Sequence, residues 1–217
     1  LFAKGGGETE KQIFEIASES KDMSLRFDLT VPLARYVSEH FSELNFPFKR
    51  YQIGKVYRGE RNQKGRYKEF YQADIDIIGN NELSIYNDAI LARVIFEAFN
   101  RIDFPNITFH INNRKLLNGF FESLEIEDST EVLRTIDKKD KIGIEKTKAL
   151  LDEIIGTKSA KRTLEFIDLD KNNSEILNDL EKLSDNELFL EGLDELKTVY
   201  EYMLKFGIDD KNINIDL

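Results

Sequence analysis

Hydrophobic and polar positions alternate in steps of two along four stretches of the first third of the chain, and this period predicts β-strands. Gln12–Ala17 and Met23–Asp28 predict two short strands joined by a polar turn at Ser18–Asp22. Two longer runs, Lys49–Gly59 and Lys68–Gly79, predict strands separated by a charged loop that is longer than a tight hairpin needs. A sheet is therefore expected in this part of the chain.

Steps of three and four residues predict amphipathic helices on either side of the long strands. Thr30 can cap the first helix, and Pro32 is tolerated in its first turn. The apolar stripe expected on this helix consists of Val31, Ala34, Val37, Phe41 and Leu44. The second helix is predicted over Glu82–Ile102, and a further strand follows at Ile107–Asn112. Its stripe is expected to consist of Ile85, Ala89, Ala92, Ile95, Phe96 and Phe99.

From about Arg114 to Phe206 the pattern changes to short helical segments, which indicates a separate helical insertion. The chain then turns at Gly207–Asp210 and returns as a strand over Asn212–Leu217. The predicted organisation is a part with strands and helices at 1–112, an insertion at 113–206 and a return strand to the sheet of the first part at 207–217. The predicted helices of the insertion are Lys115–Leu124, Glu131–Asp137, Glu145–Ile155, Ser159–Ile167 and Glu187–Phe206.

Charged and amide side chains gather on one face of the predicted strands, because residues i and i+2 of a strand share a face. In Met23–Asp28 the polar face carries Ser24, Arg26 and Asp28. In the two long strands it carries Gln52, Gly54, Val56 and Arg58, and Phe70, Gln72, Asp74 and Asp76. The opposite face, with Tyr71, Ala73, Ile75 and Ile77, is expected to pack under the helices.

Two interpretations of the polar face stay open at this point. Antiparallel sheets often have one solvated face, which would explain it without any ligand. Alternatively, aspartate and glutamine can hold an ammonium group while an arginine clamps a phosphate or carboxylate, and Gly54 leaves room for a close approach. The second interpretation predicts a site for a zwitterion beside a phosphate.

Composition narrows the class of protein. The 217 residues include 31 basic and 41 acidic side chains, and the formal charge of −10 argues against a broad nucleic-acid-binding surface. Without cysteine and with only His40 and His110, no metal site built from protein side chains is expected. Both histidines are interpreted as structural or exposed. No apolar run is long enough for a membrane span and no signal peptide is visible, so we expect a cytoplasmic protein without a membrane partner.

The two ends of the sequence suggest a fragment. The chain begins at Leu1 without methionine and stops at Leu217 within a strand-like stretch. Neither end resembles a natural terminus, so we expect further parts of the protein on both sides.

The two long strands carry a family resemblance. Residues 48–61 (FKRYQIGKVYRGER) and 65–79 (GRYKEFYQADIDIIG) resemble motif 2 of class II aminoacyl-tRNA synthetases, in the form of the histidine-specific enzymes. Residues 25–32 (LRFDLTVP) are similar to the amino-acid-binding strand of these enzymes. The resemblance implies an α+β fold, in which helices flank an antiparallel class II catalytic sheet and an all-helical insertion is added.

The resemblance also implies an ATP site. Arg58 resembles the motif 2 arginine that grips the α-phosphate of ATP and the carboxylate of histidine, and Arg66 resembles the loop arginine that reaches the γ-phosphate. Both are therefore the candidate catalytic residues. Glu60 resembles the residue that helps to place the adenine or a metal-bound water, and Phe70 resembles the ring that stacks on adenine. The alternatives are a surface arginine, loop charges and a core aromatic ring.

The histidine site implied by the resemblance lies on the same face. Asp28, Thr30 and Gln72 resemble the group that holds the α-ammonium of histidine, with Leu29 in the same strand end and Arg58 at the carboxylate. Asp76 resembles the carboxylate that recognises the imidazole N–H. Asp74 shares the face, but no role is assigned to it.

By resemblance, the expected activity is ATP-dependent activation of L-histidine to histidyl-adenylate, followed by transfer to tRNA(His). The cofactors are ATP and Mg²⁺, and the full-length protein is expected to be a homodimer. Motif 1, the histidine loop, motif 3 and the anticodon-binding domain are missing from the sequence, so the 217 residues alone are expected to have little or no ligase activity.

Two other functions remain as alternatives. The regulatory subunit of ATP phosphoribosyltransferase shares this fold and binds histidine, but it would be expected to lack Arg58 and Arg66. A synthetase-like module that only binds RNA or another protein is the second alternative, and the negative net charge argues against it.

Overall fold

The computed structural model describes residues 11–17, 23–60, 64–126, 129–167 and 171–217, which divide into two compact units. The N-terminal unit is Leu1–Leu83 and the helical unit is Ser84–Leu217. Among the described residues, no helix is long and apolar enough to cross a membrane.

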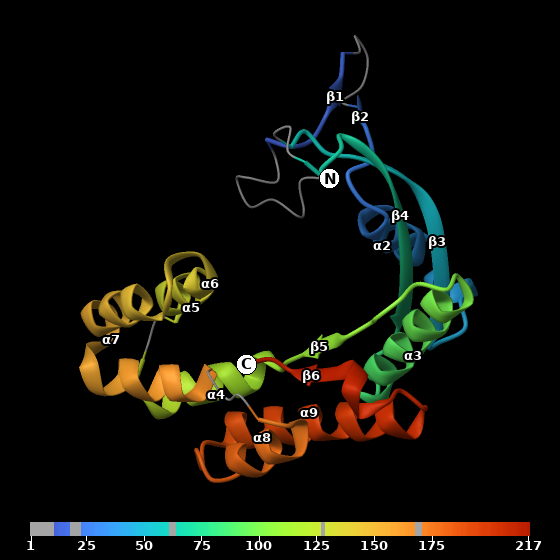
Figure 1. Ribbon diagram of the computed structural model, residues 1–217. Helices are drawn as coiled ribbons and strands as arrows, with labels where there is room; N and C mark the ends of the chain where they lie inside the picture. The colour runs from blue at the N-terminus through green and yellow to red at the C-terminus, as the bar shows by residue number, and fades with distance from the viewer. Residues whose placement is uncertain (1–10, 18–22, 61–63, 127–128, 168–170) are drawn as a thin grey trace. The chain divides into compact units, whose positions relative to one another are not determined.

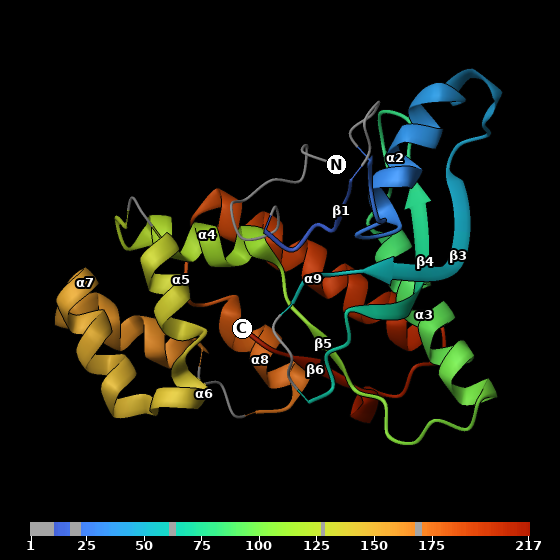
Figure 2. The same cartoon turned by 90° about the horizontal axis from the view of Figure 1, so that it is seen from above.

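The N-terminal unit is built around one long antiparallel hairpin (Figure 1). Its elements are β1 (Glu15–Ile16), β2 (Met23–Ser24), α2 (Thr30–Glu39), a 3₁₀ turn (Phe41–Glu43), β3 (Phe48–Tyr57) and β4 (Glu69–Ile78). β3 pairs with β4 from Phe48 opposite Ile78 to Tyr57 opposite Glu69, so the two long strands predicted from the alternation are confirmed to within one or two residues at each end. Both strands curve together, and α2 lies beside them (Figure 2).

The polar face of this hairpin is the covered one. The segment 25–29 is its neighbour: the Tyr57 amide donates to the Arg26 carbonyl at 2.8 Å, and Leu29 is fully buried. On the opposite face Tyr51, Ile53 and Tyr71 are 67–78% exposed. The expectation that the face with Tyr71 and Ala73 packs under helices is therefore wrong at its outer half, while Ile75 and Ile77 are half-buried.

The beginning of α2 corrects a second expectation. Thr30 makes no capping hydrogen bond, and the carboxylate of Asp28 accepts from the Val31 amide at 2.9 Å instead. The buried positions are Leu29, Leu33 and Val37, which follow one another in steps of four. Ala34 and Phe41, both placed in the predicted stripe, are exposed. Ala34 lies beside the buried line of Leu33 and Val37, and Phe41 lies beyond the end of α2, in the 3₁₀ turn.

The helical unit contains most of the predicted helices, with two that were not predicted. Its elements are α3 (Tyr86–Arg101), β5 (Phe109–Ile111), α4 (Arg114–Ser123), α5 (Thr130–Ile136), α6 (Lys139–Ile142), α7 (Ile144–Ile167), α8 (Asn173–Leu180), α9 (Glu187–Lys205), a 3₁₀ turn (Asp210–Asn212) and β6 (Ile213–Ile215). α7 breaks at Gly156, whose φ is 75°, and thus corresponds to the two helices predicted on either side of it. α6 and α8 were missed.

β5 and β6 enclose the helical stretch along the chain and pair with each other in parallel, Phe109 opposite Ile213 and Ile111 opposite Ile215. This parallel pair differs from the antiparallel arrangement that was expected of the sheet. The described strands form three two-stranded sheets, of which β1–β2 and β3–β4 are antiparallel. Helices that begin after β5 and end before its neighbour β6 have the connectivity expected of an insertion.

Asn173, at the start of α8, connects that helix to β6 through hydrogen bonds from its side chain to the backbone of the strand. Its buried side-chain amide donates to the Ile213 carbonyl at 2.8 Å and accepts from the Ile215 amide at 3.0 Å. It also donates to Asp210, which accepts from the Tyr200 hydroxyl at 2.8 Å. Burial, together with this hydrogen bond, raises the pKa of Tyr200. The network provides hydrogen-bond partners for buried polar groups where α8, α9 and β6 meet.

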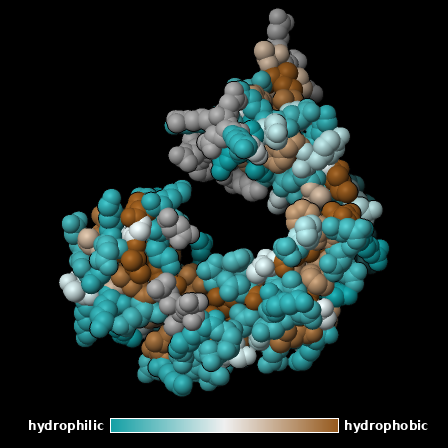
Figure 3. Space-filling model, in the orientation of Figure 1, coloured by the Kyte–Doolittle hydropathy of each residue, from teal (hydrophilic) through white to brown (hydrophobic). Residues whose placement is uncertain are grey.

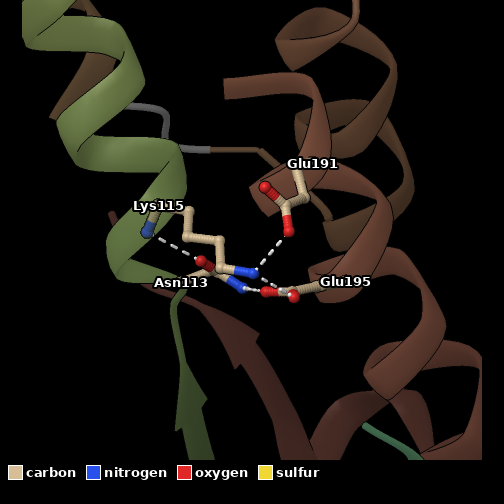
Figure 4. Close-up of polar contacts among 4 residues, drawn as sticks. All are labelled: Asn113, Lys115, Glu191 and Glu195. Atoms are coloured by element: carbon tan, nitrogen blue, oxygen red, sulfur yellow. Dashed lines mark hydrogen bonds and ion pairs between the residues drawn. The ribbon is translucent and has the colours of Figure 1, made fainter. Parts of the chain in front are cut away.

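α4 and α9 are in backbone contact, because each helix has a glycine at the place where the other's backbone approaches it. A Cβ on Gly119 would lie 2.2 Å from the Phe189 nitrogen, and one on Gly192 would lie 2.3 Å from the Leu116 nitrogen. Beside this contact, Lys115 donates to Glu191 at 2.7 Å and to Glu195 at 2.5 Å, and Asn113 donates to Glu195 (Figure 4). The core around it includes Leu116, Phe120, Phe166, Phe189 and Leu193.

The surface over α8 and α9 is mostly hydrophilic (Figure 3).

Candidate functional site

The strand register brings the predicted polar residues together on one face of the hairpin. Gly54 lies opposite Gln72, Gln52 opposite Asp74, and Val56 opposite Phe70. Two-residue steps then place Asp76 on the same face, opposite Arg50. The prediction that these residues of the two long strands share a face is confirmed.

The segment that carries Asp28 and Leu29 lies across this face. Arg50 Nη2 donates to the Leu29 carbonyl at 3.2 Å, and Arg58 Nε donates to the Phe27 carbonyl at 3.3 Å. A Cβ added to Gly54 would lie 3.4 Å from Arg26 and 3.5 Å from Leu29, so Gly54 is indeed approached closely, by the protein's own side chains. The predicted histidine-binding segment and the predicted motif 2 strands therefore meet.

Arg58 is held by two aromatic rings. Its guanidinium lies 4.7 Å from the centre of the Phe27 ring and 5.2 Å from that of Phe70. Such cation–π contacts orient a guanidinium without neutralising it. No carboxylate of a described residue forms an ion pair with Arg58, so the charge is positioned and uncompensated. This arrangement suits an anionic ligand.

Glu60 and Arg66 lie in the connection between β3 and β4 and form an ion pair at 2.9 Å. Glu60 is largely covered, whereas Arg66 is exposed at the outer side of the pair. Residues 61–63, within the predicted motif, lie outside the described residues. An exposed arginine in a long connection can exchange its carboxylate partner for a phosphate with little loss, because such an exposed pair contributes only about 0–1 kcal/mol.

Buried polar atoms without hydrogen bonds gather on the same face. Arg50 Nε, Gln72 Oε1 and Asp76 Oδ2 all lack a hydrogen-bond partner. Arg50 Nη2 is only 2.9 Å from Asp76 Oδ2, yet this close ion pair does not have the geometry of a hydrogen bond. Since buried polar groups are nearly always hydrogen-bonded, these three exceptions on one face make that face the candidate site for a polar ligand.

The remaining predicted residues contribute in different ways. Asp28 is 3% exposed and its Oδ1 caps α2, Leu29 is buried, and Thr30 is exposed on the first turn. Asp74 accepts a hydrogen bond of 3.3 Å from Gln72. The two histidines lie elsewhere: His40 contacts Glu43, and His110, which is exposed, contacts Asp216.

One residue of the site was missed from the sequence. Arg50 lies two positions before Gln52, so the same alternation that placed Gln52 on the polar face also places Arg50 there. The predicted strand, Lys49–Gly59, already contained Arg50, but its polar face was followed only from Gln52 onward. Extending the two-residue step by one position would have found it.

The described residues contain no group of three or more acidic or histidine side chains able to hold a metal ion. Mg²⁺ in nucleotide sites is commonly held by one or two carboxylates together with the phosphates. Glu60, the carboxylate nearest in the chain to Arg58, is paired with Arg66 at 2.9 Å, so it would have to leave Arg66 to hold a magnesium ion that arrives with a nucleotide.

A hollow of about 380 Å³ lies in the helical unit. Its lining combines Arg114 and Arg134 with Asp137 and several small polar side chains. This mixture of charges does not single out a ligand class, and none of the predicted site residues lines it.

Comparisons with known proteins agree on one family. A family model described as histidyl-tRNA synthetase matches residues 1–217. A histidine–tRNA ligase of Finegoldia magna is 55% identical over 219 residues, which cover 100% of this chain and 51% of the relative. The crystal structure of a Nostoc histidyl-tRNA synthetase matches with a TM-score of 0.85 and 35% identity, over 94% of this chain and 48% of that one.

A more distant structure shows the same fold. It is described as an ATP phosphoribosyltransferase regulatory subunit/histidyl-tRNA synthetase from Bacillus halodurans. It matches with a TM-score of 0.80 at 18% identity, over 96% of this chain and 53% of its own. The chain spans about half the length of the curated relatives it matches.

Proposed function

Because the chain belongs to the histidyl-tRNA synthetase family, we propose that it supplies the ATP and histidine pocket of a histidine–tRNA ligase. The observation that carries this proposal is Arg58, a positioned guanidinium without a carboxylate partner on a face that also holds unsatisfied buried polar atoms. In a full-length protein the product is histidyl-tRNA(His), and the active form is a homodimer.

The first step joins the carboxylate of histidine to the α-phosphorus of ATP and releases pyrophosphate. Arg58 binds the α-phosphate and the histidine carboxylate, which aligns the attacking oxygen and offsets the charge that develops on phosphorus. Arg66 leaves Glu60 for the γ-phosphate, and Phe70 stacks on the adenine. Magnesium bound to the phosphates supplies further charge neutralisation. No side chain needs to become a covalent nucleophile.

Histidine recognition falls to the opposite end of the same face. Asp28, Thr30 and Gln72 hold the α-ammonium, and Leu29 closes this side of the pocket. Asp76 accepts a hydrogen bond from the imidazole N–H. An amino acid without that N–H leaves one oxygen of the Asp76 carboxylate without a donor, which gives strong discrimination.

The test of this proposal uses a full-length protein that carries this chain. Arg58→Ala is expected to lower the rate of histidine-dependent ATP–pyrophosphate exchange by about 100-fold or more, the usual effect of removing one transition-state donor. tRNA(His) binding should stay nearly unchanged. Arg35→Ala is the matched control, because Arg35 is an exposed arginine on α2 that pairs only with Glu39. An active Arg58→Ala protein would rule out the phosphate clamp.

The second candidate function is a histidine-binding regulatory subunit. Only the fold-level similarity to the Bacillus halodurans structure favours it. Calorimetry distinguishes the two, because a ligase binds ATP and histidine together, whereas a regulatory subunit binds histidine alone. The retention of both Arg58 and Arg66 supports the ligase.

A further inference from the structure

Arg50 makes several contacts within the candidate site, and the proposed function assigns no role to it. Its side chain is 11% exposed, and it lies in β3 directly opposite Asp76 of β4. One terminal nitrogen, Nη2, is 2.9 Å from Asp76 Oδ2 and donates to the Leu29 carbonyl at 3.2 Å. The other, Nη1, donates to Gln52 at 2.7 Å. A single guanidinium thus contacts three parts of the N-terminal unit.

Stability alone does not account for such a residue. Removing a guanidinium and a carboxylate from water is costly, and a well-packed apolar pair is often at least as stable. The geometry here is also incomplete, since Arg50 Nε and Asp76 Oδ2 lack hydrogen bonds. A pair that is costly and only partly satisfied is better explained by what it positions.

Arg50 connects the two sides of the proposed histidine pocket. Asp76 is the residue proposed to accept from the imidazole, and Leu29 belongs to the segment proposed to hold the ammonium. The guanidinium occupies Oδ2 of Asp76, and no described residue donates a hydrogen bond to its Oδ1. One carboxylate oxygen is therefore anchored while the other is left for a ligand N–H.

We propose that Arg50 is a positioning residue for histidine recognition: it anchors one oxygen of Asp76, directs the other at the imidazole N–H, and sets the distance to the ammonium-binding segment at Leu29. This inference rests on the proposed function. Arg50 does not touch the substrate. It determines how selective the pocket is for an imidazole side chain.

The test compares Arg50→Lys, Arg50→Met and the matched surface variant Arg35→Lys in a full-length protein that carries this chain. A lysine keeps the charge, but a single ammonium cannot reproduce the planar fork that contacts Asp76, Gln52 and Leu29 together. Arg50→Lys is expected to raise the KM for histidine about 10-fold or more, the size of one lost charge-assisted hydrogen bond. The KM for ATP should stay within about two-fold of the wild type, because Arg58 and Arg66 are unchanged.

Two further measurements separate positioning from a merely structural role. In the Asp76→Asn background, Arg50→Lys should add little to the KM for histidine, because both substitutions act on one interaction. Arg50→Lys should also reduce the preference for histidine over thienylalanine, an analogue with a similar ring but no N–H. A purely structural residue would lower activity toward both amino acids alike.

Each outcome decides the question. Equal increases in the KM values for histidine and ATP, or effects that add fully to those of Asp76→Asn, would overturn the proposal. So would a failure of both Arg50 variants to fold, since the residue would then be structural. If the wild-type protein shows no histidine-dependent exchange, the proposed function itself fails. If it shows exchange and Arg50→Lys leaves the KM for histidine unchanged, only this inference fails.

Discussion

Both units of the chain contain buried side-chain atoms without a hydrogen-bond partner, but these atoms are arranged differently in the two units. In each unit, three buried side-chain atoms of described residues lack a hydrogen-bond partner. In the helical unit they belong to Asn87 on α3 and to Asp152 and Thr163, which lie on opposite sides of the break in α7. In the N-terminal unit all three lie on one face of the β3–β4 hairpin. Their clustering, and not their number, identifies the candidate site.

Packing differs in the same direction. The helical unit has a core of large buried side chains, with α4 and α9 in backbone contact at their glycines. The N-terminal unit buries few large residues, and its hairpin leaves aromatic and aliphatic side chains exposed on one face. The comparison suggests that the helical unit is optimised for stability, while the hairpin keeps polar groups in place for a ligand at some cost in stability.

The largest expected effect tests the packing of the helical unit. In an open helix, Gly→Ala stabilises by about 1 kcal/mol. At Gly119 the added methyl would lie 2.2 Å from a backbone nitrogen of α9, which no rotation of a side chain can relieve. Gly119→Ala is therefore expected to destabilise the helical unit by about 3 kcal/mol or more, because α4 and α9 must separate. Urea unfolding followed by circular dichroism would measure the change.

Gly65→Ala serves as the control for Gly119→Ala. Gly65 has a φ of +82° and no atom within 4 Å of an added Cβ, so the substitution introduces only backbone strain of about 1 kcal/mol. Because the chain has two units, amide hydrogen exchange should show that Gly119→Ala lowers protection in α4 and α9 and leaves β3 and β4 unchanged. An unaltered unfolding midpoint for Gly119→Ala would show that the helices separate easily, and would break the comparison.

A smaller effect of opposite sign is expected on the hairpin. Gln72 buries a carbonyl oxygen without a donor, and its amide makes only one hydrogen bond, of 3.3 Å, to Asp74. Gln72→Leu has a similar volume and removes the unsatisfied acceptor, so it should stabilise the N-terminal unit by up to about 1 kcal/mol. The same variant should lose histidine binding in a full-length protein. A clear loss of stability would mean that the polar face is structural.

The hairpin could be predicted from sequence because its alternation is long and regular. Ten residue pairs in register keep Gln52, Gly54, Gln72 and Asp76 on one face, and a period of two leaves no freedom in that assignment. Which face would be covered could not be inferred from the same pattern. That depends on where segment 25–29 crosses the hairpin, and its contacts are made by side chains and carbonyls far away in sequence.

The errors in the helices have local causes. α8 was missed because no helix was predicted between Ile167 and Glu187, whereas the Asn172 side chain accepts from the Glu175 amide and caps a helix there. At α2 the cap was assigned to Thr30, two residues after Asp28, because Asp28 was assigned only to the ligand site. In both cases a short polar side chain had two possible functions, and the pattern of apolar residues does not distinguish between them.

The smallest expected effect concerns the charges beside the α4–α9 contact. Two hydrogen bonds lower the pKa of Glu195: the one from Lys115 has the larger effect, and the one from Asn113 the smaller. A carboxyl whose pKa is lower in the folded state stabilises the fold above its unfolded pKa of about 4.3, and this contribution is lost as the pH falls through the folded value. Asp88 acts in the opposite sense, because burial and then the charge of Glu195 raise its pKa.

Glu195→Gln removes the contribution of the lowered Glu195 pKa and also part of the charge that raises the pKa of Asp88. These two changes act on the pH dependence of stability in opposite directions, so they partly cancel. The variant should lose less than about 1 kcal/mol at neutral pH, as for other partly exposed pairs. Its urea midpoint should also fall less steeply than that of the wild type between about pH 5 and pH 3. Glu191→Gln is the matched control, because it leaves the contact of Lys115 with Glu195 in place. Parallel curves for Glu195→Gln and the wild type would contradict a net contribution of this ion pair to the pH dependence of stability.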